Sequence, residues 1–296
     1  MSNDIERYIE ELRSALAGSD LAMIQDAVGD AEEHLIVALQ EAHMANPGMS
    51  SSDAWRAVVD EYGAPGDVAK AYLEMEERTR PILRPVKPAP GRPGLERFFA
   101  ILGDPRAYAA LVFNLFSLVT GILYFTWAVT GLSLSVGLIV LIIGLPFFGL
   151  FVFSIQGLAL VEGMLIEAML GIRMPRRPVS APRVEGLWRR FMARITDRRT
   201  WSTLLYLLLK LPMGVISFSV FITLLAYAVQ LILLPVIQIG LDMPLLSFGD
   251  QRVFVPLWSM PILMLAGFLE LVIVLHLSKY VARASGAMAK AMLVRG

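Results

Sequence analysis

The chain has 296 residues, of which 56% are hydrophobic, and its 26 basic and 26 acidic side chains give a formal net charge of zero. The mean hydropathy of +0.62 is typical of a protein embedded in a bilayer. Cysteine is absent, which excludes disulfides, iron–sulfur clusters and Cys-based zinc sites.

The charge is divided unevenly along the chain. Residues 1–80 contain 17 Asp and Glu against 6 Lys and Arg, whereas residues 81–296 contain 9 against 20. An acidic head disfavours direct binding of nucleic acid, because phosphate contacts need Lys and Arg. Three interpretations remain: a well-solvated helical domain, a head that docks a basic partner, and a head that folds back onto the chain's own basic membrane face.

Residues 1–80 predict a small cytoplasmic bundle of about four helices. Asn3 and Glu6 match a capping box, while Asn46-Pro47-Gly48 and Gly63 interrupt the later helical patterns. The second predicted helix carries an acidic face, which we interpret as the candidate partner-docking face and which consists of Asp26, Asp30, Glu32 and Glu33.

Two histidines in the head raise the question of a metal site. His34 and His43 are nine residues apart, which places them about 180° apart around a helix. We therefore expect solvated or interface histidines and no metal.

The end of the head resembles a known family. The segment EYGAPGDVA at residues 61–69 is a glycine stop followed by a proline-started helix, and the acidic second helix of the head lies earlier in the chain. It resembles the HAAS-type helical signalling domain found at the N-termini of bacterial membrane proteins. The resemblance implies a cytoplasmic transcription regulator of the PadR-like class as the partner.

Residues 81–94 are rich in proline and predict an extended linker. The remainder, residues 95–296, is predicted to be the membrane domain. It begins with the segment 95–103, which mixes aromatic and basic residues as 187–195 does. Both are expected to lie as short helices in the cytoplasmic headgroup layer.

Residues 107–160 contain no charged side chain and are about twice as long as one spanning helix requires. The small, weakly polar stretch 131–135 predicts a break between two helices. Four spans are expected, at about 107–130, 136–161, 203–233 and 257–279. The third is long for a bilayer and contains Pro212, so it is expected to tilt, kink or project. The predicted fold class is all-α: a small helical bundle followed by a four-helix polytopic membrane domain.

The membrane domain also predicts an internal repeat. A shift of 93 residues places Asp104, Gly121 and Phe125 on Asp197, Gly214 and Phe218 without a gap, in a two-helix unit. A later resemblance at a shift of 123 indicates about 30 extra residues in the second copy, near 235–256.

Orientation follows from the basic loops. Residues 171–200 contain nine arginines against Glu185 and Asp197, whereas residues 235–256 contain only Arg252 as a basic residue. The positive-inside rule therefore predicts a multi-pass protein of the cell (inner) membrane with both termini in the cytoplasm.

Ionisable residues within the spans form the candidate intramembrane polar cluster, since they are costly in lipid unless paired. The cluster consists of Glu162, Glu167, Lys210, Glu270 and His276. We predict that Glu162 and Lys210 form a pair that links the two repeats. Structural stabilisation, a ligand or proton site, and snorkelling to the interface are all compatible with this pattern.

Catalytic motifs are absent from the sequence: there is no HExxH, no Walker motif, no dinucleotide glycine motif and no Ser-His-Asp spacing. We therefore predict that the protein is not an enzyme and has no cofactor.

The membrane half resembles the sensor domain of actinobacterial-type membrane proteins, in the run from Trp201 to Gly214, in Gly121–Phe125, in the Gly137–Pro146 run and in Glu162 before Ala168–Gly171. In that family the domain is attached to histidine kinases or accompanies a helical head. No kinase motif follows here, so a signal is expected to leave through the head. The predicted function is an integral membrane sensor that relays a membrane or envelope signal to the regulator. The alternative is a small transporter or channel that uses the polar cluster. The lipid bilayer and further copies of the chain are the other expected partners.

Overall fold

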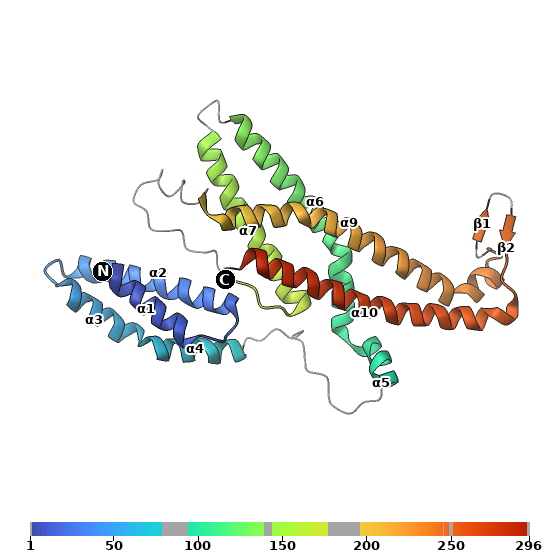
Figure 1. The fold of residues 1–296 in the computed structure, drawn as a ribbon, viewed down its shortest axis with the longest axis horizontal. Helices are drawn as coiled ribbons and strands as arrows, with labels where there is room; N and C mark the ends of the chain where they lie inside the picture. Colours follow the sequence, from blue (N-terminus) through green and yellow to red (C-terminus); the bar gives the residue numbers. More distant parts are fainter. Residues whose placement is uncertain are drawn as a thin grey trace. The chain divides into compact units, whose positions relative to one another are not determined.

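A computed structural model describes residues 2–78, 94–138, 144–176, 196–244, 246–248 and 251–294. Within these residues the chain is almost entirely helical, which confirms the all-α class (Figure 1). The chain is divided into two compact units. One contains residues 1–84, 131–206 and 288–296, and the other contains residues 85–130 and 207–287. The predicted linker, except for Gly94, and the predicted segment 187–195 lie outside the described residues.

The acidic head forms four helices: α1 (Ser2–Ala15), α2 (Leu21–Ala45), α3 (Ser51–Tyr62) and α4 (Pro65–Arg78). Apolar side chains at helical spacing meet in one core, in which Leu12, Leu16 and Leu35 are completely buried. Side chains cap the N-termini of two of the helices. Asp20 accepts a hydrogen bond from the N–H of Ala22 at the start of α2, and Ser50 accepts one from the N–H of Asp53 at the start of α3.

Tyr8 links the first helix of the head to the turn before α4. Its hydroxyl donates to the carbonyl oxygen of Gly63 at 2.7 Å, and Gly63 has a φ of 106°, a conformation that favours glycine. Burial, together with the nearby Tyr62 and Glu11, raises the pKa of Tyr8 to about 12. The hydroxyl therefore remains a donor throughout the physiological range.

Within the part of the chain that the structure describes, four further helices are long and apolar enough to cross a membrane: α6 (Pro105–Leu138), α7 (Gly144–Leu170), α9 (Arg198–Ile232) and α10 (Met260–Leu293). This confirms the predicted number of spans. The helix α9 continues through Pro212. A short helix, α5 (Gly94–Phe99), and a 3₁₀ turn, Ala100–Gly103, precede α6.

The predicted break at residues 131–135 is wrong, because α6 continues to Leu138 and the second predicted span therefore begins too early. Ser135 donates its hydroxyl to the carbonyl oxygen of Gly131 at 2.6 Å, so its polar group is satisfied inside the helix. Gly131 also provides space for the ring of Phe151, since a Cβ atom there would lie 2.1 Å from that ring.

Two glycines bring α6 and α9 into backbone contact. A Cβ atom on Gly121 would lie 2.8 Å from the carbonyl oxygen of Lys210, and one on Gly214 would lie 2.4 Å from that of Ser117. The 93-residue shift of the predicted repeat places Gly121 on Gly214 and Ser117 on Lys210. The two contacts are therefore equivalent positions in the two copies of the repeat. Small residues at such crossings are the usual means of close helix packing in membranes.

Polar contacts also hold α10 against the start of α6. The Asn114 amide donates to the carbonyl oxygen of Ser278 at 3.0 Å, and the ammonium of Lys279 lies 2.6 Å from the Asp104 carboxylate. Burial raises the pKa of Asp104, but hydrogen bonds from Lys279 and from the N–H of Arg106 lower it more, so the pKa lies below its ordinary value.

The connection between α9 and α10 contains structure that the sequence analysis did not predict. A π-helical turn, Val236–Gly240, is followed by the short strands β1 (Leu246–Phe248) and β2 (Gln251–Val253), which pair antiparallel. The amide of Gln238 donates to the carbonyl oxygen of Val255 at 2.7 Å and accepts from its N–H at 2.8 Å.

Candidate functional site

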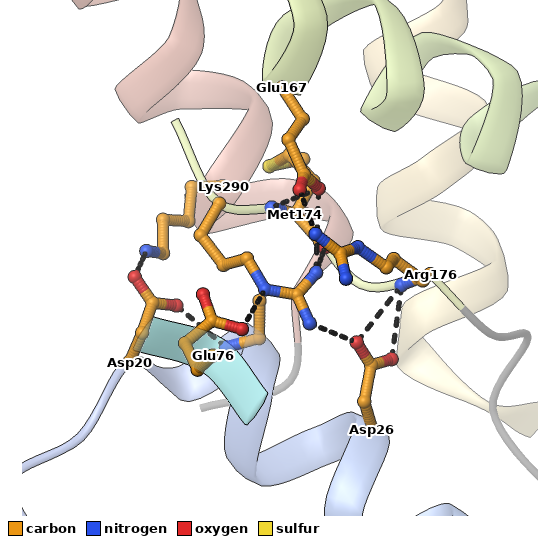
Figure 2. A network of polar contacts seen from close by, with 9 residues as sticks. Asp20, Asp26, Glu76, Glu167, Met174, Arg176 and Lys290 are labelled. Carbon is orange, nitrogen blue, oxygen red and sulfur yellow. Dashed lines mark hydrogen bonds and ion pairs between the residues drawn. The ribbon is translucent and has the colours of Figure 1, made fainter. Parts of the chain in front are cut away.

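The candidate site lies where α7 ends. Gly171, at a φ of 67°, closes the helix, and its N–H donates to the carbonyl oxygen of Glu167 at 3.1 Å. The chain then leaves the helix as an irregular segment that contains Arg173 and Arg176. Figure 2 shows the network of polar contacts around this segment, which involves carboxylates from α2, α4 and α7.

Arg173 is the centre of the network and is almost buried, with 10% of its side chain exposed. Its guanidinium donates to Asp26 of α2 at 2.8 Å, to Glu76 of α4 at 3.2 Å and to Glu167 of α7 at 3.4 Å. A guanidinium presents five N–H donors in a fixed plane, so it can bind several carboxylates at once. One side chain therefore connects two helices of the head to the end of a membrane helix.

Arg176 adds a second connection between the same parts. Its backbone N–H donates to both carboxylate oxygens of Asp26, at 3.0 and 3.2 Å, and its guanidinium donates to Glu167 at 2.6 Å. The bond to Glu167 raises the pKa of Arg176, although burial opposes it. The arginine therefore stays charged.

The end of α10 makes a third connection to the head. Lys290 donates to Asp20, the residue that caps α2, at 2.5 Å (Figure 2). Nearby, Ser202 and Arg199 at the start of α9 donate to carbonyl oxygens of Met292 and Leu293 in the last turn of α10. These contacts join the ends of α9 and α10.

We use the term polar junction for the seven side chains that make these ionic contacts: Asp20, Asp26, Glu76, Glu167, Arg173, Arg176 and Lys290. All of them carry charge, and each contact is between opposite charges. Nothing in the arrangement resembles a nucleophile with its base. Among the residues that the structure describes, no group of three or more His, Asp or Glu side chains is arranged to hold a metal ion.

The predicted docking face has members in different surroundings. Asp26 belongs to the polar junction, and Asp30 accepts a hydrogen bond from the hydroxyl of Tyr72. Glu32 is half-buried and Glu33 is exposed. His34 stacks on the ring of Tyr62 with 4.5 Å between the ring centroids.

The predicted intramembrane cluster includes two fully buried ionisable residues. Glu162 is completely buried and accepts a hydrogen bond from the hydroxyl of Tyr206 at 2.8 Å. Lys210 is 2% exposed, and its ammonium lies 4.7 Å from the centroid of the Phe113 ring. The Glu162–Lys210 pair stays a prediction.

The other three members have different environments. Glu167 binds the arginines of the polar junction. Glu270 is half-buried on α10. His276 lies on the exposed side of α10, where its ring stacks on Phe98 of α5 with 5.0 Å between the centroids.

Sequence reasoning did not single out the roles of Tyr206 and of the carboxylates Asp20 and Glu76. A signal for Tyr206 was present, because it lies four residues before Lys210 and therefore on the same face of one helix. No such signal marked Asp20 or Glu76, because their partners are distant in sequence.

The fold and these contacts define a multi-pass, all-α membrane protein with a helical head. The family model described as "Putative sensor" matches residues 113–293, more than half of the chain. The protein therefore belongs to this sensor family. A search of curated proteins and a search of solved structures each found no match.

Proposed function

We propose that the protein is a sensor of the cell (inner) membrane that relays a membrane or envelope signal to a cytoplasmic regulator through its N-terminal bundle. The observation that supports this most strongly is the polar junction, because it couples the ends of α7 and α10 to α2 and α4. A change in the membrane helices that moves Arg173 would break or form contacts with the head directly.

The orientation in this proposal has the two termini and the polar junction in the cytoplasm. It rests on the arginine-rich sequence that follows α7 and on the positive-inside rule. The partner in this proposal is a PadR-like regulator, on the resemblance of the head to HAAS-type domains. Asp26 is the member of the docking face whose availability would change when the head detaches.

Binding of a purified PadR-like regulator to the full-length protein in nanodiscs tests the proposal. We expect the double variant Arg173→Gln/Arg176→Gln, which removes both guanidinium groups of the polar junction and so weakens the attachment of the head, to change the regulator's affinity at least tenfold. Arg283→Gln removes an exposed arginine of α10 outside the polar junction and should leave the affinity unchanged. The proposal fails if the regulator binds neither the wild type nor the double variant.

Transport is the second candidate function, and the burial of Glu162 and Lys210 in membrane-length helices favours it. Ionisable groups in such positions often mark ion or proton pathways. Solute or proton flux into liposomes that Glu162→Gln or Glu270→Gln abolishes would support transport, whereas liposomes without flux would contradict it.

A further inference from the structure

The polar junction divides its charges unequally between its two sides. The head contributes three carboxylates, while the ends of the membrane helices contribute three cations and one carboxylate; the cations are Arg173, Arg176 and Lys290, and the carboxylate is Glu167. When the head is attached, its carboxylates neutralise the cations. When it detaches, the membrane side keeps an excess of positive charge that needs another anion.

We propose that Arg173 and the backbone N–H of Arg176 form a binding site for the phosphate of an anionic phospholipid headgroup. In this proposal the lipid and the Asp26 carboxylate compete for the same donors. The proposal rests on the proposed function, in which the head carries the signal, and it adds the ligand that regulates the attachment of the head.

The contacts of Asp26 show what kind of anion the site accepts. The N–H of Arg176 donates to both oxygens of this carboxylate, and the Arg173 guanidinium donates to one of them. The donors therefore bind an anion that presents two adjacent oxygens. The phosphodiester of a phospholipid presents two such oxygens, and guanidinium groups bind phosphate in the same forked manner as carboxylate.

The position of the donors favours a lipid as the source of the phosphate. Arg173 follows the last residue of α7, Leu170, by three residues, which span at most about 10 Å. The headgroup layer extends about 5 to 8 Å beyond the hydrocarbon core on each side. Arginines directly after a spanning helix are therefore within reach of headgroups, and such segments attract anionic lipids.

Glu167 explains how the site stays formed after the head leaves. It belongs to the last turn of α7 and binds both Arg173 and Arg176. This carboxylate therefore keeps the two guanidinium groups together at the end of the helix while Asp26 and the lipid phosphate exchange.

Spin labels on the full-length protein provide the test. Because the chain has no cysteine, Met44→Cys and Ala291→Cys place labels only on an exposed residue of the head and on the exposed side of the end of α10. Distances are measured in nanodiscs of phosphatidylcholine alone and of equal parts phosphatidylcholine and phosphatidylglycerol. We expect one narrow distance distribution in phosphatidylcholine and loss of most of that population with phosphatidylglycerol.

Two variants control the test. Arg173→Gln/Arg176→Gln should abolish the difference between the two lipids, because it removes the Arg173 guanidinium, the charged donor for which the two anions compete, and leaves only the backbone N–H of residue 176. Arg283→Gln removes one arginine from the same helix as the Ala291 label and should retain the full difference.

The remaining outcomes contradict the proposal in distinct ways. A narrow distribution in both lipids overturns lipid competition and leaves the proposed function intact. Broad distributions in both lipids overturn both, because the head is then not attached. Release by inorganic phosphate in phosphatidylcholine nanodiscs, with no additional release by phosphatidylglycerol, overturns the assignment to a lipid.

Discussion

The head and the membrane helices bury opposite kinds of side chains. In the head, Leu12, Leu16 and Leu35 are completely buried and most charges are exposed. Among the membrane helices, Glu162 and Lys210 are buried, while many large apolar side chains of α6 and α9 are exposed. The difference teaches that burial follows the surrounding solvent: water drives apolar groups inward, whereas lipid removes that force and leaves close backbone contact and polar bonds to hold the helices.

The contact between α6 and α9 should be the most sensitive feature of the membrane half. Gly214→Val should eliminate the folded protein, because even its first side-chain carbon would lie 2.4 Å from the backbone oxygen of Ser117. Yield of monodisperse protein and the melting temperature in detergent measure the effect. Gly157→Val is the matched control, since nothing lies within 4 Å of the corresponding Cβ. Equal behaviour of the two variants would show that close backbone contact does not hold this pair.

The head should respond to the loss of apolar volume as a soluble domain does. Leu35 is completely buried, so Leu35→Ala should destabilise the bundle by about 3 kcal/mol. Hydrogen exchange of α2 in the full-length protein measures the change. Val37 lies on the same helix and is 46% exposed, so Val37→Ala should cost less than about 0.5 kcal/mol. Similar costs for both would contradict the assigned core.

A buried hydrogen bond should matter more in the membrane half than an exposed tyrosine does. Tyr206→Phe removes the donor to the Glu162 side chain and should cost about 2 kcal/mol, because a buried acceptor loses this hydrogen bond. Thermal unfolding of the full-length protein measures this cost. The comparison variant is Tyr227→Phe, at a position that is 53% exposed, where a change below about 0.5 kcal/mol is expected. If Tyr206→Phe left the stability unchanged, the hydrogen bond between Tyr206 and Glu162 would not contribute to holding the membrane helices together.

The smallest effect is expected from the contact between Asp104 and Lys279. The pKa of Asp104 is lowered, so its contribution to stability is complete above the ordinary value of 3.8 and is lost as the pH falls through the lower, folded-state pKa. Because the pair is partly exposed, we expect less than about 1 kcal/mol. Melting temperatures of wild type and Asp104→Asn should differ at neutral pH and converge in acid. A difference in melting temperature that stays the same at every pH would show that the ionised Asp104 carboxylate is not the source of this stability.

The sequence predicted the elements better than it predicted their contacts. Capping residues, helical spacing and apolar runs predict the helices of the head and the four spanning helices, because these signals are local. The break at residues 131–135 was predicted wrongly because glycine and serine are common in loops. In the structure both residues lie inside α6: the ring of Phe151 packs against Gly131, and the hydroxyl of Ser135 donates to the carbonyl oxygen of Gly131. Glu167 was grouped with the membrane charges, but its partners are the arginines that follow α7.

By itself, the sequence determined that this is an all-α membrane protein with an acidic head, because composition and periodicity are properties of consecutive residues. The partners of its charges were decided by the tertiary structure. Asp26 and Arg173 are 147 positions apart, and Glu162 and Tyr206 are 44 apart. Such pairs depend on where separate helices end and which faces they turn to one another, and no local pattern in the chain encodes that geometry.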